Sequence, residues 1–199
     1  MRIYLAGPEV FLPDAEAVAA AKKEICARHG AIGVFPTDLH ADHAETANMP
    51  RWYSIYLRNE AHMRDSDALI ANLTPFRGPS ADAGTVYELG FMRALGRPVA
   101  GYTNDGVLFL PRTLRALGPE GARHAPDGRW YDTEGLAIED FGLVDNLMID
   151  GGIRAADGML AVAEVSSADR WHDLTAFTAC VRHLTRRVPR PPADVRSPG

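Results

Sequence analysis

The stretch "DALIANLTPFRGPSADAGTVYELGFMRALGRPVAGY", residues 67–102, holds the pattern that decides the fold. It opens with a continuous apolar run at 67–73, which is typical of a strand buried on both faces. A long loop with two Gly and two Pro follows at 74–84, then a helical segment from Gly84 and a second strand at 97–102. A strand, a helix and another strand in this order predict parallel strands joined by a crossover helix.

The same alternation continues toward the N-terminus. Strands are predicted at 2–7 and 31–36, and helices at 14–30 and 51–66. The first of these helices has an N-cap residue in Asp14 and a stop signal in Gly30. We therefore predict an α/β fold: a parallel sheet of the flavodoxin or Rossmann kind, sandwiched between helices on both faces.

The C-terminal half has a weaker pattern. Residues 103–135 are rich in Gly, Pro and Asp and predict a long irregular excursion, and 135–153 is apolar enough to pack on a neighbour. A last helix is predicted within 167–187, capped by Ser167 or Asp169. We expect one domain over 1–187 and a mobile Pro-rich tail at 188–199.

Composition limits the classes of partner. The chain of 199 residues is 46% hydrophobic and 24% charged, with a net charge of −5, so neither a nucleic acid polymer nor an anionic membrane is an expected partner. No apolar run approaches the ~20 residues of a membrane span, and the N-terminus lacks a signal-peptide pattern. The two distant cysteines, Cys26 and Cys180, predict buried thiols. We expect a cytoplasmic protein.

Glu88 is the first candidate for chemistry. On a helix that advances about 100° per residue, Glu88 shares one arc with four small or apolar residues, Gly84, Phe91, Met92 and Leu95. A Glu in a helix is usually solvated, but this arc predicts burial. A carboxylate in such a place has its charged form destabilised, which is frequent at catalytic sites.

Asp82 and the loop before it form the second candidate. Asp82 precedes the helix, so its side chain either caps the helix or reaches into a pocket. The long loop is predicted at the carboxyl edge of the sheet, together with Gly7-Pro8 and Thr37-Asp38, and ligands of such sheets bind at that edge. The loop lacks the spacing of a phosphate-binding loop, and Asp82 would repel a phosphate.

Other chemistries have little support in the sequence. The group His40, His43 and His62, with two nearby Asp residues, Asp38 and Asp42, does not have the spacing of a metal site, so we predict no metal. "GPEVF" has too few glycines for a dinucleotide-binding turn, and no serine nucleophile elbow is present. We predict no organic cofactor.

At this point the residues resemble a known family. The central stretch, with "IYLAGPEVF" upstream and "DFGLVDNLM" downstream, is similar to the nucleoside 2-deoxyribosyltransferases over roughly residues 2–150. The resemblance implies that Glu88 is the nucleophile, that Tyr4 orients it and that Asp82 binds a sugar hydroxyl. It also implies that Asn146 completes the pocket of a neighbouring subunit, hence a homo-oligomer. The implied substrates are deoxynucleosides and free nucleobases.

One position departs from the family pattern. Several members carry an acid that protonates the leaving base, and the matching residue here is Asn59, which cannot donate a proton in that way. Either Asp38, Glu60 or a water molecule then supplies the proton, or protonation of the base is less important here. Asn59 would instead be a residue that recognises the base. Gly7 and Phe11 are further expected substrate-binding residues, near the loops 8–12 and 37–60 that the family uses for the base.

The implied reaction is transfer of 2-deoxyribose between bases through a glycosyl-glutamate ester. One alternative is an N-glycosidase of the same fold, which hydrolyses a nucleoside or a deoxynucleoside monophosphate. In that reaction water, and not a second base, attacks the glycosyl-glutamate ester. Asp82 favours free nucleosides, because it faces the place where a phosphate would lie. A non-catalytic nucleotide-binding module is the other alternative.

Overall fold

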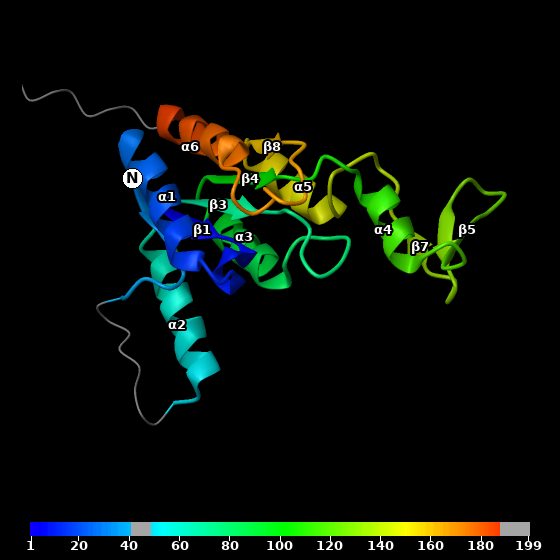
Figure 1. Cartoon of the computed structure of the whole chain (residues 1–199), viewed down its shortest axis with the longest axis horizontal. Helices are drawn as coiled ribbons and strands as arrows, with labels where there is room; N and C mark the ends of the chain where they lie inside the picture. Colours follow the sequence, from blue (N-terminus) through cyan, green and yellow to red (C-terminus); the bar gives the residue numbers. More distant parts are fainter. Residues whose placement is uncertain (41–48, 188–199) are drawn as a thin grey trace, which may run out of the picture.

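A five-stranded parallel sheet forms the centre of the molecule (Figure 1). The computed structural model describes residues 1–40 and 49–187. The strand order is β2-β1-β3-β4-β8, and every neighbouring pair is parallel. The strands are β1 (Arg2–Ala6), β2 (Ile32–Val34), β3 (Ala68–Asn72), β4 (Val99–Thr103) and β8 (Leu160–Val162). The predicted α/β class is confirmed.

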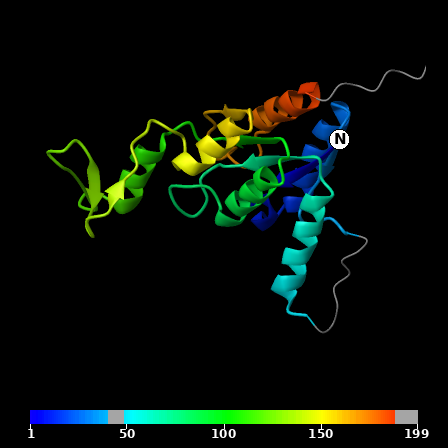
Figure 2. The same ribbon diagram turned by 180° about the vertical axis from the view of Figure 1, so that it is seen from behind.

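Helices cover both faces of this sheet, and the alternation of side chains along β1 separates the two layers. Ile3 and Leu5 pack with α1 (Ala15–Arg28) and α6 (Thr175–Arg187), which lie side by side (Figures 1 and 2). Tyr4 and Ala6 point to the opposite face. That face is covered by α2 (Arg51–Arg64), α3 (Ala83–Ala94) and α5 (Leu147–Ala155).

The strand order makes the carboxyl ends of β1 and β3 the point at which the connections of the sheet diverge. After β1 the chain crosses to β2 on one side, and it returns to β3 on the other side of β1. The connections after β1 and after β3 therefore diverge, and ligands of open parallel sheets bind at such a point. The short helix η1 (Pro8–Phe11) follows β1 there, and the loop 73–82 follows β3.

The prediction that 103–135 is irregular was wrong. This part contains α4 (Phe109–Leu117) and most of a small antiparallel sheet of β5 (Ala122–His124), β6 (Trp130–Asp132) and β7 (Ala137–Ile138). The Gly and Asp residues that suggested a loop form its hairpin turns, as Gly128 does with a φ of 82°. Together with α4 the small sheet forms an arm that projects from the body (Figure 2).

Several boundaries also differ from the predictions. The last helix begins at Thr175, whose N–H donates to Asp173 Oδ1 at 2.8 Å, so neither predicted cap, Ser167 or Asp169, begins it. Asp14 precedes α1 as predicted, but its carboxylate accepts a hydrogen bond from His172 Nε2 at 2.9 Å instead of capping the helix. Strand β8, which has three residues, is a further element that the sequence analysis does not predict. The predicted tail, 188–199, lies outside the described residues.

No helix within residues 1–40 and 49–187 is long and apolar enough to cross a membrane.

A buried polar network joins the carboxyl ends of the central strands. Glu9 and Lys22, which are 0% and 1% exposed, form an ion pair. Glu9 Oε1 also accepts hydrogen bonds from Asn72 Nδ2 and the Tyr102 hydroxyl, both at 2.8 Å. Burial raises the pKa of Glu9, but Lys22 and the hydrogen bonds outweigh it, so the pKa lies below its ordinary value.

Gly7 is required by this network. A Cβ on Gly7 would lie 1.9 Å from Glu9 Oε2 and 2.9 Å from Asn72 Cβ. Any side chain would push the Glu9 carboxylate away from its partners. Gly7, predicted as a substrate-binding residue, therefore has a clear structural reason to be glycine.

We predict that Lys22→Met destabilises the protein by about 3–5 kcal/mol, because it leaves the Glu9 charge buried without its cation. Guanidinium chloride unfolding measures the change. The double variant Glu9→Gln/Lys22→Met removes both charges and keeps an amide oxygen for Asn72 and Tyr102, so it should recover most of the loss. An equal loss in both variants would contradict this account.

Candidate active site

A hydrogen bond between Tyr4 and Glu88 forms the centre of the candidate site. The Tyr4 hydroxyl donates to Glu88 Oε1 at 2.7 Å. Tyr4 is fully buried on β1 and points to the face that α3 covers, and Glu88 reaches it from the second turn of α3. Two sequence-predicted residues, 84 positions apart, are thus brought together.

Glu88 lies at the border of the buried face of α3. The predicted arc was wrong in part, because Gly84 and Leu95 are exposed. The buried face is formed by three residues at helical spacing, Thr85, Leu89 and Met92. Glu88 is next to this line and half-buried, so its carboxylate reaches the Tyr4 hydroxyl and still faces the edge of the sheet.

The surroundings of Glu88 destabilise the charged form of its carboxyl group. Burial raises the pKa of Glu88 to about 7, the Tyr4 hydrogen bond lowers it, and the charge of Asp82 raises it further. Burial and Glu88 also raise the pKa of Tyr4 well above its ordinary value, while Arg58 lowers it. Tyr4 is therefore a neutral donor, and Glu88 changes its charge near neutral pH.

Asp82 is the N-cap of α3, as one of the two expectations had it. Its Oδ2 accepts hydrogen bonds from the Thr85 N–H at 2.9 Å and the Thr85 hydroxyl at 3.1 Å. Both bonds end on the same oxygen. Asp82 Oδ1 accepts no hydrogen bond from any other residue in the described part of the chain. One residue thus caps the helix and keeps a carboxylate oxygen for a ligand.

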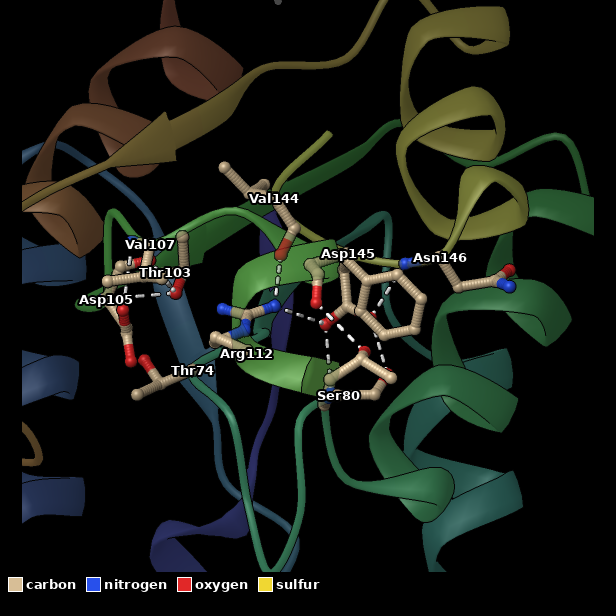
Figure 3. Close-up of polar contacts among 12 residues, drawn as sticks. Thr74, Ser80, Thr103, Asp105, Val107, Arg112, Val144, Asp145 and Asn146 are labelled. Carbon is tan, nitrogen blue, oxygen red and sulfur yellow. Dashed lines mark hydrogen bonds and ion pairs between the residues drawn. The ribbon is translucent and has the colours of Figure 1, made fainter. Parts of the chain in front are cut away.

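The residues before Asp82 are held by Asp145, which lies between β7 and α5 (Figure 3). Ser80 Oγ donates to Asp145 Oδ1 at 2.5 Å, and the Ala81 N–H donates to Asp145 Oδ2 at 2.9 Å. Asn146, the next residue, caps α5: its Oδ1 accepts from the Met148 N–H at 3.0 Å. Its amide donates to Glu139 Oε1 at 2.6 Å. Within the described residues of this chain, Asn146 does not contact the Tyr4–Glu88 pair.

Helix α2 places two polar groups beside the same cluster. Asn59 precedes Met63 by one turn, and Met63 packs in the cluster that contains Tyr4. Asn59 Oδ1 and Arg58 Nε are both buried, and neither has a hydrogen-bond partner in 1–40 or 49–187. Sequence reasoning had missed Arg58; the available signal was its position one turn before His62, which is buried.

The two alternative proton donors are held in ion pairs. Asp38 pairs with Lys23, and its other oxygen accepts from the Phe35 N–H at 2.9 Å. Glu60 accepts from Arg64 Nε at 2.9 Å. Both carboxylates therefore already have partners within this chain.

An aromatic stack lies at the carboxyl edge beside η1. Phe11 and Phe76 stack with ring centroids 5.4 Å apart. The Arg77 guanidinium lies 5.2 Å from the Phe11 ring centre and 4.6 Å from that of Phe76. Phe11 is 57% exposed, so the stack presents a flat, partly open surface at this edge.

The predicted histidine group is only partly described. His43 and Asp42 lie outside the described residues. Among the residues that are described, no group of three His, Cys, Asp or Glu side chains has an arrangement that would hold a metal ion. His62 Nε2 lies 3.0 Å from the Asp38 carbonyl oxygen, and burial lowers its pKa.

Comparison with known proteins finds relatives over most of the chain. The sequence model of the family described as "Nucleoside 2-deoxyribosyltransferase" matches residues 3–148. A solved 2-desoxiribosyltransferase from Leishmania mexicana is 30% identical, with a TM-score of 0.61, and the match covers 92% of this chain and 97% of that one.

Two further proteins are similar to this chain. An uncharacterized protein of Schizosaccharomyces pombe is 36% identical over 171 aligned residues, and the match covers 80% of this chain and 80% of that one. A conserved protein from Enterococcus faecalis is 21% identical, with a TM-score of 0.53, and the match covers 92% of this chain and 98% of that one. The second shows a shared fold.

We predict that Glu88→Gln stabilises the protein more at high pH than at low pH. The folded-state pKa of Glu88, about 7, lies above its ordinary value of 4.5. The stability that the neutral carboxyl group contributes is therefore present below about pH 4.5 and is lost as the pH rises through 7. Relative to wild type, Glu88→Gln should gain up to about 3 kcal/mol at pH 8 and little at pH 4.5.

Unfolding in urea at both pH values checks this prediction, with the exposed Glu120→Gln as the matched control. A gain that does not depend on pH would contradict a raised pKa at Glu88.

Proposed function

The chain belongs to the nucleoside 2-deoxyribosyltransferase family, and we propose that it transfers 2-deoxyribose between nucleobases through a covalent ester on Glu88. The family and its solved relative indicate a deoxyribosyltransferase-type enzyme that acts on nucleosides and nucleobases. The observation that carries the covalent mechanism is the Tyr4–Glu88 hydrogen bond of 2.7 Å at the carboxyl edge of the sheet.

The reaction has two displacements at one carbon. A Glu88 oxygen attacks the anomeric carbon of the deoxyribose, and the bond to the base breaks, with its electron pair leaving on the base. In the second step a ring nitrogen of another base attacks the same carbon and releases the Glu88 carboxylate. Two inversions give overall retention. The Tyr4 hydrogen bond fixes one oxygen of Glu88 and so orients the other.

Asp82 supports recognition of the sugar. Its Oδ1 is available to accept a hydrogen bond from a sugar hydroxyl, while Oδ2 caps α3. This carboxylate discriminates against a donor that lacks the hydroxyl, because Oδ1 then loses that hydrogen bond. The same charge would repel a phosphate group. Both arguments favour nucleosides as substrates over nucleotides.

The leaving base is bound by Asn59 in this proposal, and Arg58 contributes positive charge nearby. The unpaired Asn59 Oδ1 and Arg58 Nε are groups that a bound base would satisfy. An amide recognises a base edge by hydrogen bonds, and a guanidinium stabilises negative charge that develops on the departing base. Phe11, in its stack with Phe76, offers the base a surface to pack on.

We also propose a homo-oligomer in which Asn146 approaches the pocket of a neighbouring subunit. Asn146 is the N-cap of α5, at the end of the segment that follows β7 of the arm. Within residues 136–148, three large apolar side chains are more than half exposed: Leu136, Phe141 and Met148. Exposed apolar groups in one region are typical of a subunit interface.

The first test mixes the pure protein with 2′-deoxyinosine, with and without adenine. We expect 2′-deoxyadenosine to form faster than free deoxyribose. Free sugar that appears at the same rate with and without adenine would identify a hydrolase instead. The same pair of reactions is then run with thymidine as the donor. If neither donor reacts, the proposed function fails.

We predict that Glu88→Ala lowers the transfer rate by at least about a thousandfold, because it removes the nucleophile. Mass spectrometry of the wild-type protein quenched with 2′-deoxyinosine should show one added deoxyribosyl group, and the Ala variant should show none. Tight nucleoside binding by both proteins without turnover would support a binding module.

We predict that kcat/KM of the wild type rises with pH through about 7 and then levels, because Glu88 must be ionised to attack. In Tyr4→Phe this rise should move upward by about one pH unit, because the lost hydrogen bond had lowered the pKa of Glu88. Tyr131→Phe, on the arm, is the matched control. An unshifted profile in Tyr4→Phe would exclude the orienting role.

A further inference from the structure

A buried carboxylate, Asp145, joins the arm to the loop that ends at Asp82. Asp145 is 2% exposed and Arg112 is 5% exposed. Figure 3 shows the Arg112 guanidinium beside Asp145, with Ser80 directly below. Neither residue carries a role in the proposed reaction, so the reason for burying this charge pair lies elsewhere.

Both oxygens of Asp145 are used. Oδ1 accepts from Ser80 Oγ at 2.5 Å and from the Asn146 N–H at 2.8 Å. Oδ2 accepts from the Ala81 N–H at 2.9 Å and lies 3.7 Å from Arg112 Nη2. Arg112 is itself fixed by a hydrogen bond to the Val144 carbonyl oxygen. Two of the donors thus come from the loop, and the cation comes from α4 of the arm.

The loop is also held at its beginning. The Thr74 N–H donates to Asn72 Oδ1 at 3.0 Å, next to the Glu9 network, and Thr74 Oγ1 accepts from the Asn104 N–H at 3.0 Å. Between the anchors, the Phe76 N–H closes a turn on the Ser80 carbonyl oxygen at 3.0 Å. Within the described residues, the side-chain acceptor that holds the end of this loop is therefore Asp145.

Asp82 follows directly after the residue that Asp145 holds. The Ala81 N–H is bound on one side of Asp82, and on the other side Thr85 binds its Oδ2. These bonds fix the main chain before Asp82 and the side chain after it. The position of the remaining oxygen, Asp82 Oδ1, relative to Glu88 is then fixed.

We propose that Asp145, neutralised by Arg112, is the positioning residue for Asp82 and so sets how well the enzyme recognises the sugar hydroxyl. This role rests on the proposed function, in which Asp82 binds that hydroxyl. A charged acceptor suits the task, because hydrogen bonds to a carboxylate are about twice as strong as those between neutral groups. An Asn at position 145 would have one acceptor oxygen where the loop and Asn146 need two.

The test compares donors with and without a sugar hydroxyl. For each variant, kcat/KM is measured with 2′-deoxyinosine, with 2′,3′-dideoxyinosine and with 2′,5′-dideoxyinosine. The ratio between the complete donor and each deoxygenated donor is the readout. This ratio does not depend on how much of the protein is folded, so a merely structural effect leaves it unchanged.

We expect wild type to prefer the complete donor over one of the two analogues by about 10- to 150-fold, the range of a hydrogen bond to a charged group. Asp82→Ala should abolish this preference and so identify the hydroxyl. Asp145→Asn should lower the same ratio at least about fivefold, by slowing the complete donor. Ser80→Ala keeps the ion pair and should lower the ratio by a smaller factor.

Two substitutions elsewhere serve as matched controls. Asp67→Asn changes a carboxylate that accepts a hydrogen bond from the Arg2 N–H at 2.8 Å, before the amino end of β3 and so at the opposite end of the sheet from this loop. Ser166→Ala removes a hydroxyl that donates to Asp169 at 2.8 Å. Both should keep the wild-type ratio.

An unchanged ratio in Asp145→Asn and Ser80→Ala, with a collapsed ratio in Asp82→Ala, would overturn the proposal and leave the proposed function standing. If Asp145→Asn does not fold, Ser80→Ala alone decides between the two results. A wild type that turns over none of the donors overturns the proposed function, and with it this role of Asp145.

Discussion

The Glu9 carboxylate holds together the edge of the sheet on which the rest of the site depends. Its partners come from α1, β3 and β4, and Glu9 itself follows β1. Four elements therefore meet at one buried charge, and that charge is compensated only when Lys22, Asn72 and Tyr102 are all in place. The same network fixes Asn72, which anchors the loop that leads to Asp82. It also forces glycine at position 7, where β1 turns into η1.

Two glutamates, the fully buried Glu9 and the half-buried Glu88, have opposite electrostatic surroundings. Glu9 has a cation and two side-chain donors, and its pKa is lowered despite burial. Glu88 has one neutral donor, Tyr4, and a repelling neighbour, Asp82, and burial raises its pKa to about 7. The neighbours of Glu9 therefore stabilise its charged form, and those of Glu88 do not. Under the proposed mechanism, Glu88 loses this poorly compensated charge when it forms the ester, whereas Glu9 has a structural task.

The sequence was sufficient for the parts of the molecule in which local pattern and packing agree. The strands at 2–7, 67–73 and 97–102 and the pairing of Tyr4 with Glu88 could be predicted, because apolar runs, helix caps and the family motif all indicate the same arrangement. The arm could not be predicted, because each of its strands has only two or three residues. The turn-forming Gly and Asp residues beside these strands make the local sequence typical of a loop. Long-range charge pairs were missed for a different reason. Nothing near Arg112 in the sequence indicates that Asp145 will neutralise it, since only the fold brings them together.

Under the proposed mechanism, the groups that bind the base differ from those that bind the sugar. On the sugar side, Asp82 Oδ2 accepts from the Thr85 N–H, and the preceding Ala81 N–H donates to Asp145. At the base end the nearby carboxylates of Asp38 and Glu60 are occupied by Lys23 and Arg64, and Asn59 has no proton to give as an acid. Under the proposed mechanism, departure of the base then relies on hydrogen bonds and on the positive charge of Arg58. The rate should therefore depend on how well each base carries negative charge, because the pocket lowers that cost without removing it. Specificity for the base would come from its own chemistry as much as from its shape.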